Sequence, residues 1–247
     1  MARDPFDGPK LKVQRANRHI LDFRAAVEAL FEANFQTETV MEADLETGHL
    51  LSPKITLPQP SPDMLLTAAD AIYNLRSALD QVVCRSVVAT GKTPEGTYFP
   101  HGKNMEGFNV SISKRCENVP EAVCGVITAL EPYYGGKGYL FRVLHDLNLV
   151  DKHTDLLSFG WSSTLRVEFS HRLKTPDREG RTDIIEGADP ADIHTHQNLQ
   201  LNLAVTFAGI EAIDGEPAGT LLRQLCDLVW QTIGLIQDAT RMHMSAQ

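Results

Sequence analysis

The chain of 247 residues is 43 % hydrophobic, 22 % charged and 7 % aromatic. This is the composition of an ordinary globular protein, and it excludes intrinsic disorder, collagen-like repeats and a small disulfide scaffold. With 32 acidic residues against 23 basic ones, the net charge of −9 argues against a general polyanion binder. The N-terminus carries scattered charges and no apolar stretch of a secretory signal, and no apolar run reaches the roughly 18–20 residues of a spanning helix. We therefore expect a cytoplasmic protein that does not enter a membrane.

Helical periodicity dominates the first 157 residues. Apolar residues spaced along one helix face predict helices over 17–35, 63–89, 120–131 and 139–157. The second helix is the best marked, because Ser61 suits the N-cap, Pro62 suits the first helical position and Gly91 suits the end. Residues 38–57 predict a hairpin or two edge strands, whereas 92–118 indicate an irregular connection.

After Gly160 the period of the apolar pattern changes from about 3.6 to 2 residues. This alternation predicts strands near 165–170 and 199–207, with a third short strand at 183–186, before a long helix from about Thr220 to Met242. Because the strands follow one another with short connections, the sheet should be antiparallel. The predicted fold class is α+β, a helical bundle core with a small antiparallel β-sheet inserted before a long C-terminal helix. We expect a single domain over 1–247, with a helical core at about 17–157 and 219–244 and a β-subdomain at about 162–212.

No strong catalytic or cofactor-binding motif occurs in the sequence. It has no G-x-S-x-G, Walker loop, G-x-G-x-x-G or H-E-x-x-H, so we expect no cofactor. The cysteines form no C-x-x-C pair. Cys84 and Cys226 lie in apolar helical patterns typical of buried thiols, and a catalytic thiol at Cys116 or Cys124 stays an open alternative.

Two groups of polar residues lie on predicted helices. Arg76 and Asp80 are spaced as an i,i+4 ion pair in a strongly apolar helix, which indicates either a buried polar contact with another helix or a plain surface pair. The helix at 139–157 carries a dense polar run from His145 to His153. There, Asp151 and His153 could contribute to a site completed by a neighbouring helix, or His153 could simply lie near the C-terminal helix dipole.

A third group is Asp189, Asp192, His194 and His196. An H-x-H pattern on an extended segment can present both imidazoles to one side, which suits zinc or another divalent ion. The alternative interpretation of 188–198 is a polar loop between strands, without a metal.

The segments 73–81 (YNLRSALDQ) and 147–153 (LNLVDKH) together resemble a family of uncharacterised bacterial proteins, many of them actinobacterial. Members of that family carry an N-L-R-S-A-L-D-H helix, a Phe-Pro element, here Phe99-Pro100, and a D-K-H helix. The resemblance spans about 62–157 and implies no particular activity.

The first of these motifs also resembles the Arg-x-x-x-x-His signature of HEPN-type helical ribonucleases. That resemblance implies a dimer that cleaves RNA without metal, in which Arg76 would hold the phosphate and a histidine would move a proton. This sequence departs from the pattern at Gln81, since glutamine is neither an acid nor a base. His153 is the candidate replacement if the two helices pack together.

These observations predict a non-catalytic helical module that binds a ligand or self-associates, with Arg76, Asp80, Asp151 and His153 in a buried polar network. The alternative is an HEPN-like ribonuclease or nucleotide-handling enzyme that uses Arg76 with His153, assisted by Asp80 and Asp151. A metal-dependent hydrolase at 189–196 is the third hypothesis. We expect a homo-oligomer, with RNA or a nucleotide as the ligand under the alternative.

Overall fold

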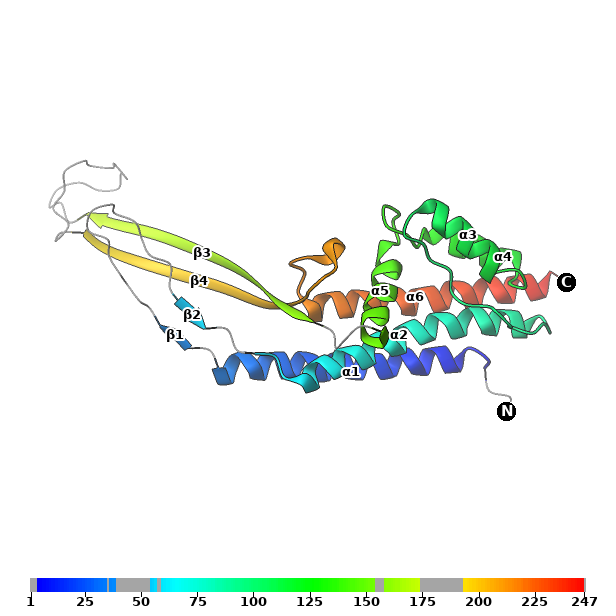
Figure 1. Ribbon diagram of the computed structural model, residues 1–247, viewed down its shortest axis with the longest axis horizontal. Helices are drawn as coiled ribbons and strands as arrows, with labels where there is room; N and C mark the ends of the chain where they lie inside the picture. Colours follow the sequence, from blue (N-terminus) through cyan, green and yellow to red (C-terminus); the bar gives the residue numbers. More distant parts are fainter. Residues whose placement is uncertain are drawn as a thin grey trace.

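The computed structural model describes residues 4–34, 36–38, 54–56, 59–153, 158–173 and 193–246, and the side chains of 4–32, 59–150, 158–160 and 204–246. Three helices of 28 residues form the body of the molecule: α1 (Asp7–Asn34), α2 (Pro62–Ala89) and α6 (Ala218–Ser245). They lie side by side, with α1 antiparallel to α2 and α6 (Figure 1). Their shared core contains fully buried side chains from each helix: Phe23, Ile72, Leu75, Leu79, Leu221 and Ile236. The predicted helical core is confirmed.

The ends of α2 are those expected from the sequence. Ser61 is the N-cap and accepts a hydrogen bond from the backbone N–H of Met64, with Pro62 at the first helical position. The helix ends at Thr90, and Gly91 follows with φ +78°, a conformation that glycine adopts without strain. By contrast, α1 starts well before the predicted residue 17. Charged residues between the buried Phe6 and Val13 hide that early helical pattern.

Three shorter helices cover one side of the body (Figure 1). They are α3 (Met105–Arg115), α4 (Glu121–Leu130) and α5 (Tyr139–His153). The interpretation of 92–118 as irregular was wrong, because it contains α3. Only Phe108 of that helix is buried, so its apolar periodicity is faint, and its start depends on Asn104, whose side chain accepts from the N–H of Gly107 at 2.8 Å.

The described strands form two antiparallel pairs. A short pair, β1 (Gln36–Glu38) and β2 (Lys54–Thr56), corresponds to the strands predicted at 38–57. A long pair, β3 (Phe159–Leu173) and β4 (Ile193–Phe207), follows α5. Because β4 starts at Ile193, the polar-loop interpretation is wrong for 193–198: backbone pairing with β3 forms there despite the polar side chains. The strand predicted at 183–186 lies outside the described residues.

The base of the long strand pair is fixed to the helical body by aromatic contacts. Phe159 lies 5.5 Å from the Phe23 ring of α1 and 5.3 Å from Phe207, between ring centroids. Thr206 pairs with Pro217, directly before α6, and a short 3₁₀ helix (Glu211–Ile213) lies between β4 and α6. From this base the strands extend away from the helices, and both chain termini lie at the opposite end of the body (Figure 1). The predicted α+β class, with antiparallel strands before a long C-terminal helix, is confirmed.

Candidate functional site

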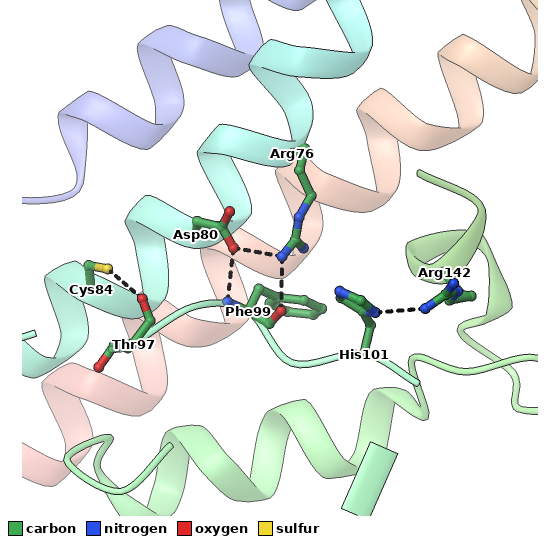
Figure 2. A network of polar contacts seen from close by, with 7 residues as sticks. All are labelled: Arg76, Asp80, Cys84, Thr97, Phe99, His101 and Arg142. Atoms are coloured by element: carbon green, nitrogen blue, oxygen red, sulfur yellow. Dashed lines mark hydrogen bonds and ion pairs between the residues drawn. The ribbon is translucent and has the colours of Figure 1, made fainter. Parts of the chain in front are cut away.

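An ion pair on α2 holds the segment before α3. Arg76 Nη2 lies 2.8 Å from Asp80 Oδ1 and donates to the carbonyl oxygen of Phe99 at 3.1 Å. The same carboxylate oxygen accepts the backbone N–H of Phe99 at 3.0 Å (Figure 2). Both polar backbone atoms of this buried residue are therefore satisfied by one ion pair, which we call the Arg76–Asp80 clamp.

One face of α2 contacts the segment 97–99 at several successive helical turns. Residues 76, 80 and 84 lie on one face of α2, because they are four positions apart. Cys84 Sγ, next along that face, donates to the carbonyl of Thr97 at 3.3 Å. The segment 97–99 thus runs along α2 and receives a contact from each successive turn (Figure 2). The ion pair predicted from the sequence is confirmed, but its further partner is this segment rather than another helix.

A second polar group lies on α5. The Arg142 guanidinium binds the Asp146 carboxylate through Nε at 3.0 Å and also through Nη2, an i,i+4 pair with two parallel hydrogen bonds. Tyr134 donates its hydroxyl to the same carboxylate at 2.8 Å. Burial and the hydrogen bond to Asp146 raise the pKa of Tyr134 to about 12.

The two groups meet at His101. Arg142 Nη1 lies 3.3 Å from Nδ1 of His101, and the His101 ring stacks on His145 of α5 with centroids 3.7 Å apart. Burial, followed by the neighbouring His145 and the charges of Arg76, Arg142 and Arg115, lowers the pKa of His101 to about 2. The ring is therefore neutral throughout the physiological range. We call this set of side chains the His101 cluster: Arg76, Asp80, His101, Arg115, Tyr134, Arg142, His145 and Asp146.

The structure places only part of the predicted network in this cluster. Arg76 and Asp80 belong to it, and α2 packs against α5 as the prediction required. Asp151 and His153 lie at the C-terminal end of α5, and their side chains are outside the described part of the chain. Gln81 faces the start of α1, where its Oε1 is 3.7 Å from the position of a Cβ on Gly8.

The predicted metal ligands lie only partly within the described residues. His194 and His196 lie two residues apart on β4, opposite Arg172 and Ser170 of β3, and their side chains are not described. Asp189 and Asp192 lie outside the described residues. Within the described part of the chain, no group of three or more His, Cys, Asp or Glu side chains could hold a metal ion.

Cys116 and Cys124, the two candidates for a catalytic thiol, lie close together. The Cys124 thiol is 3.9 Å from the carbonyl oxygen of Cys116 and 3.7 Å from that of Val119. A hydrogen bond to Cys124, together with burial, raises the pKa of Cys116, and the same hydrogen bond lowers the pKa of Cys124. These contacts place the Cys124 thiol of α4 against the connection between α3 and α4, which begins at Cys116.

Sequence reasoning missed the residues that complete the cluster. His101 directly follows the Phe99-Pro100 element, but a single histidine at that position carries no signal of its own. Arg142 precedes Asp146 by four positions, the spacing of a helical ion pair. A search for such spacings on α5 would have found this pair, whereas no local pattern indicates that His101 stacks on His145.

Comparison with protein-family models, with curated proteins and with solved structures finds no match. Among the described helices, none is both long enough and apolar enough to cross a membrane.

Proposed function

We propose that this chain is a non-catalytic helical module that binds a ligand or partner, or that self-associates. The observation that carries this proposal is the Arg76–Asp80 clamp. Its charged groups hold both polar backbone atoms of Phe99, which fixes His101 beside Arg142. A cluster held in place before any ligand arrives loses little conformational entropy on binding.

The protonation state of His101 also favours binding over catalysis. With its pKa lowered to about 2, the imidazole carries no proton to donate as a cation at neutral pH. Its low basicity also makes it a weak proton acceptor, because a catalytic base works best with a pKa near the operating pH. Nη2 of Arg76, bound to Asp80 and to the carbonyl oxygen of Phe99, is likewise engaged in the fold.

Self-association is supported by exposed apolar side chains on α6. Leu235 is 49 % exposed and Met242 is 66 % exposed, and the seven-residue spacing places them on one face of the helix. Trp230 is also 46 % exposed, but it comes five residues before Leu235 and therefore lies on a different face of the helix. Large apolar side chains gathered on an exposed face are typical of interaction surfaces.

Light scattering on wild type and Leu235→Glu tests the self-association part. Leu66→Glu on α2 is the matched control, because Leu66 is also 49 % exposed. We expect a wild-type oligomer whose subunit number falls in Leu235→Glu and is unchanged in Leu66→Glu. A wild-type monomer, or the same loss with both variants, would remove α6 from the proposal.

The second candidate function is an HEPN-like ribonuclease or a nucleotide-handling enzyme. One observation favours it: Arg142, which can hold a phosphate, lies 3.3 Å from His101, and the His101 ring contacts a second imidazole, that of His145, which can move a proton. The test is incubation of labelled RNA with wild type and His145→Ala. Cleavage by wild type that is lost in the folded variant would establish this function, and intact RNA with both proteins would exclude it.

A further inference from the structure

One buried hydrogen-bond donor in the His101 cluster has no acceptor. Arg76 is only 7 % exposed, and its Nη2 serves Asp80 and Phe99, but its Nη1 is buried without a hydrogen-bond partner. A buried donor left in this state destabilises the fold. Groups of this kind are rare in folded proteins, and a bound ion is one of the known reasons for them.

The neighbouring His101 supplies a second donor. A guanidinium has no acceptor atom, so the 3.3 Å contact between Arg142 Nη1 and Nδ1 of His101 requires Nδ1 to accept. The neutral ring therefore carries its proton on Nε2. In Figure 2 the His101 ring lies between the guanidinium groups of Arg76 and Arg142, with its other ring nitrogen on the Arg76 side.

The charges around this position are mostly positive. His101 lies within electrostatic reach of Arg76 on α2, Arg115 at the end of α3 and Arg142 on α5. The facing carboxylates are Asp80 and Asp146, which are each bound to one of these arginines. His145, stacked on His101, adds no negative charge, and neither does the Tyr134 phenol. An additional anion would therefore meet an unbalanced positive potential.

The cluster is open to solvent on one side. His101 and His145 are half-buried, Asp80 keeps 27 % of its side chain exposed, and Arg115 is exposed at the end of α3. The Arg115 guanidinium lies 5.2 Å from the centroid of the Tyr98 ring, which holds it at the edge of the cluster. These exposed side chains mark the side from which a small anion would approach Arg76.

We propose that a small oxyanion of the phosphate class binds between Nη1 of Arg76 and Nε2 of His101, with Arg115 at the entrance. Two converging donors match two oxygens of a tetrahedral anion, and Arg142 fixes the ring that presents one of them. This proposal rests on the proposed binding function and names its ligand class. The phosphate group of a free ion and that of a nucleoside monophosphate offer the same oxygens.

Histidine NMR of the full-length protein at pH 7 tests the proposal, with inorganic phosphate as the probe. We expect saturable shifts of the His101 ring signals at millimolar phosphate or below, and a raised melting temperature at saturation. Equal concentrations of sodium chloride should change neither. The absence of a saturable His101 response would overturn the oxyanion site.

Two variants separate specific binding from general attraction. Arg76→Lys removes the Nη1 donor and keeps the positive charge, so phosphate affinity should fall at least about tenfold. Arg115→Ala should weaken binding several-fold without loss of fold, and exposed Lys114→Ala is its matched control, expected to bind as wild type does. If Arg76→Lys does not fold, the Arg115 and Lys114 pair decides: equal affinity in both would overturn the proposal.

Adenosine monophosphate in the same titration distinguishes the source of the phosphate. Affinity equal to that of inorganic phosphate would show that the site recognises the oxyanion alone. Tighter binding would show that the adjoining surface also contacts the nucleoside. If phosphate fails to bind while the protein still oligomerises or retains another ligand, the oxyanion site falls and the proposed function stands.

Discussion

The imidazole rings of His101 and His145 stack with centroids 3.7 Å apart, although one follows the Phe99-Pro100 element and the other belongs to α5. This contact joins the segment held by α2 to the polar face of α5. Its position depends on two ion pairs, Arg76–Asp80 on one side and the pair on α5 that includes Arg142 on the other. Changes to either pair should therefore alter the cluster and the stability of the protein together.

Replacing Arg76 with alanine should be strongly destabilising. The change leaves the carboxylate of Asp80 without its cation and the carbonyl of Phe99 without its donor, in a largely buried position. Loss of one partner of a buried ion pair costs about 3–5 kcal/mol, and the partial exposure of Asp80 favours the lower end. Urea denaturation of wild type and variant measures this difference.

The control for that measurement is Arg85→Ala, because Arg85 is exposed on the same helix. A surface substitution of this kind should change the free energy of unfolding by no more than about 0.5 kcal/mol. Equal stability of Arg76→Ala and Arg85→Ala would show that the clamp contributes nothing to the fold.

Acidification should destabilise the protein through His101. Its pKa is lowered to about 2 in the folded state, so between pH 6.5 and pH 2 the unfolded chain binds a proton that the folded chain does not. The free energy of unfolding should therefore fall as the pH drops below 6.5, by up to about 1.4 kcal/mol per pH unit for this one group. Urea denaturation at pH 7.0, about 5.5 and about 4.5 measures the slope.

In His101→Gln this part of the slope should disappear, since glutamine does not titrate. His19→Gln, a half-buried position on α1, should keep the wild-type slope. A variant slope identical to that of wild type would mean that folding does not lower the pKa of His101.

Tyr134→Phe should lower the free energy of unfolding by about 1 kcal/mol, the usual value of a single hydrogen bond. The variant loses the hydroxyl that donates to Asp146 at 2.8 Å but keeps the ring. A spectrophotometric titration checks the same contact, because Tyr134 should ionise only at about pH 12. Since the phenol stays protonated in the fold, its contribution to stability is fully present below pH 10 and is lost as the pH rises from 10 to about 12. Persistence of that late ionisation in the phenylalanine variant would assign it to another tyrosine.

Gly102, the residue after His101, should not tolerate a side chain. A Cβ at this position would lie 2.3 Å from the backbone nitrogen of Phe108, so the backbone must shift, at a cost of about 1–3 kcal/mol. Gly125→Ala in α4 is the opposite case, because nothing lies within 4 Å of its Cβ position and alanine favours a helix by about 1 kcal/mol. Thermal denaturation should show a lower melting temperature for Gly102→Ala and a higher one for Gly125→Ala. A neutral Gly102→Ala would mean that the turn after His101 is not tightly packed.

The sequence predicted those helices and strands that are marked by capping residues or by a regular apolar pattern. The limits of α2 followed from Ser61, Pro62 and Gly91, and the long strand pair followed from a change of period after Gly160. The helix α3 was missed because a mostly exposed helix shows little apolar periodicity, and its N-cap Asn104 is a weak signal when taken alone.

The candidate site was predictable only in part for a related physical reason. Arg76 and Asp80 are four residues apart on one helix, so their pairing is a local property of the sequence. The position of His101 depends on how the segment after α2 folds back along that helix, and its stacking on His145 depends on the packing of α5. Such contacts between distant segments cannot be predicted from the spacing of residues within one segment. The roles of Asp151 and His153 stay predictions.

The most direct test of the central claim is native mass spectrometry of the purified protein, followed by the same sample after denaturation. If the chain is a binding or self-association module, the native spectrum should show either a retained ligand that is released on denaturation or a defined oligomer of bare chains. A retained mass that matches phosphate or a nucleotide would also support the site between Arg76 and His101. A bare monomer under native conditions that also binds no added phosphate or nucleotide would contradict the proposed function.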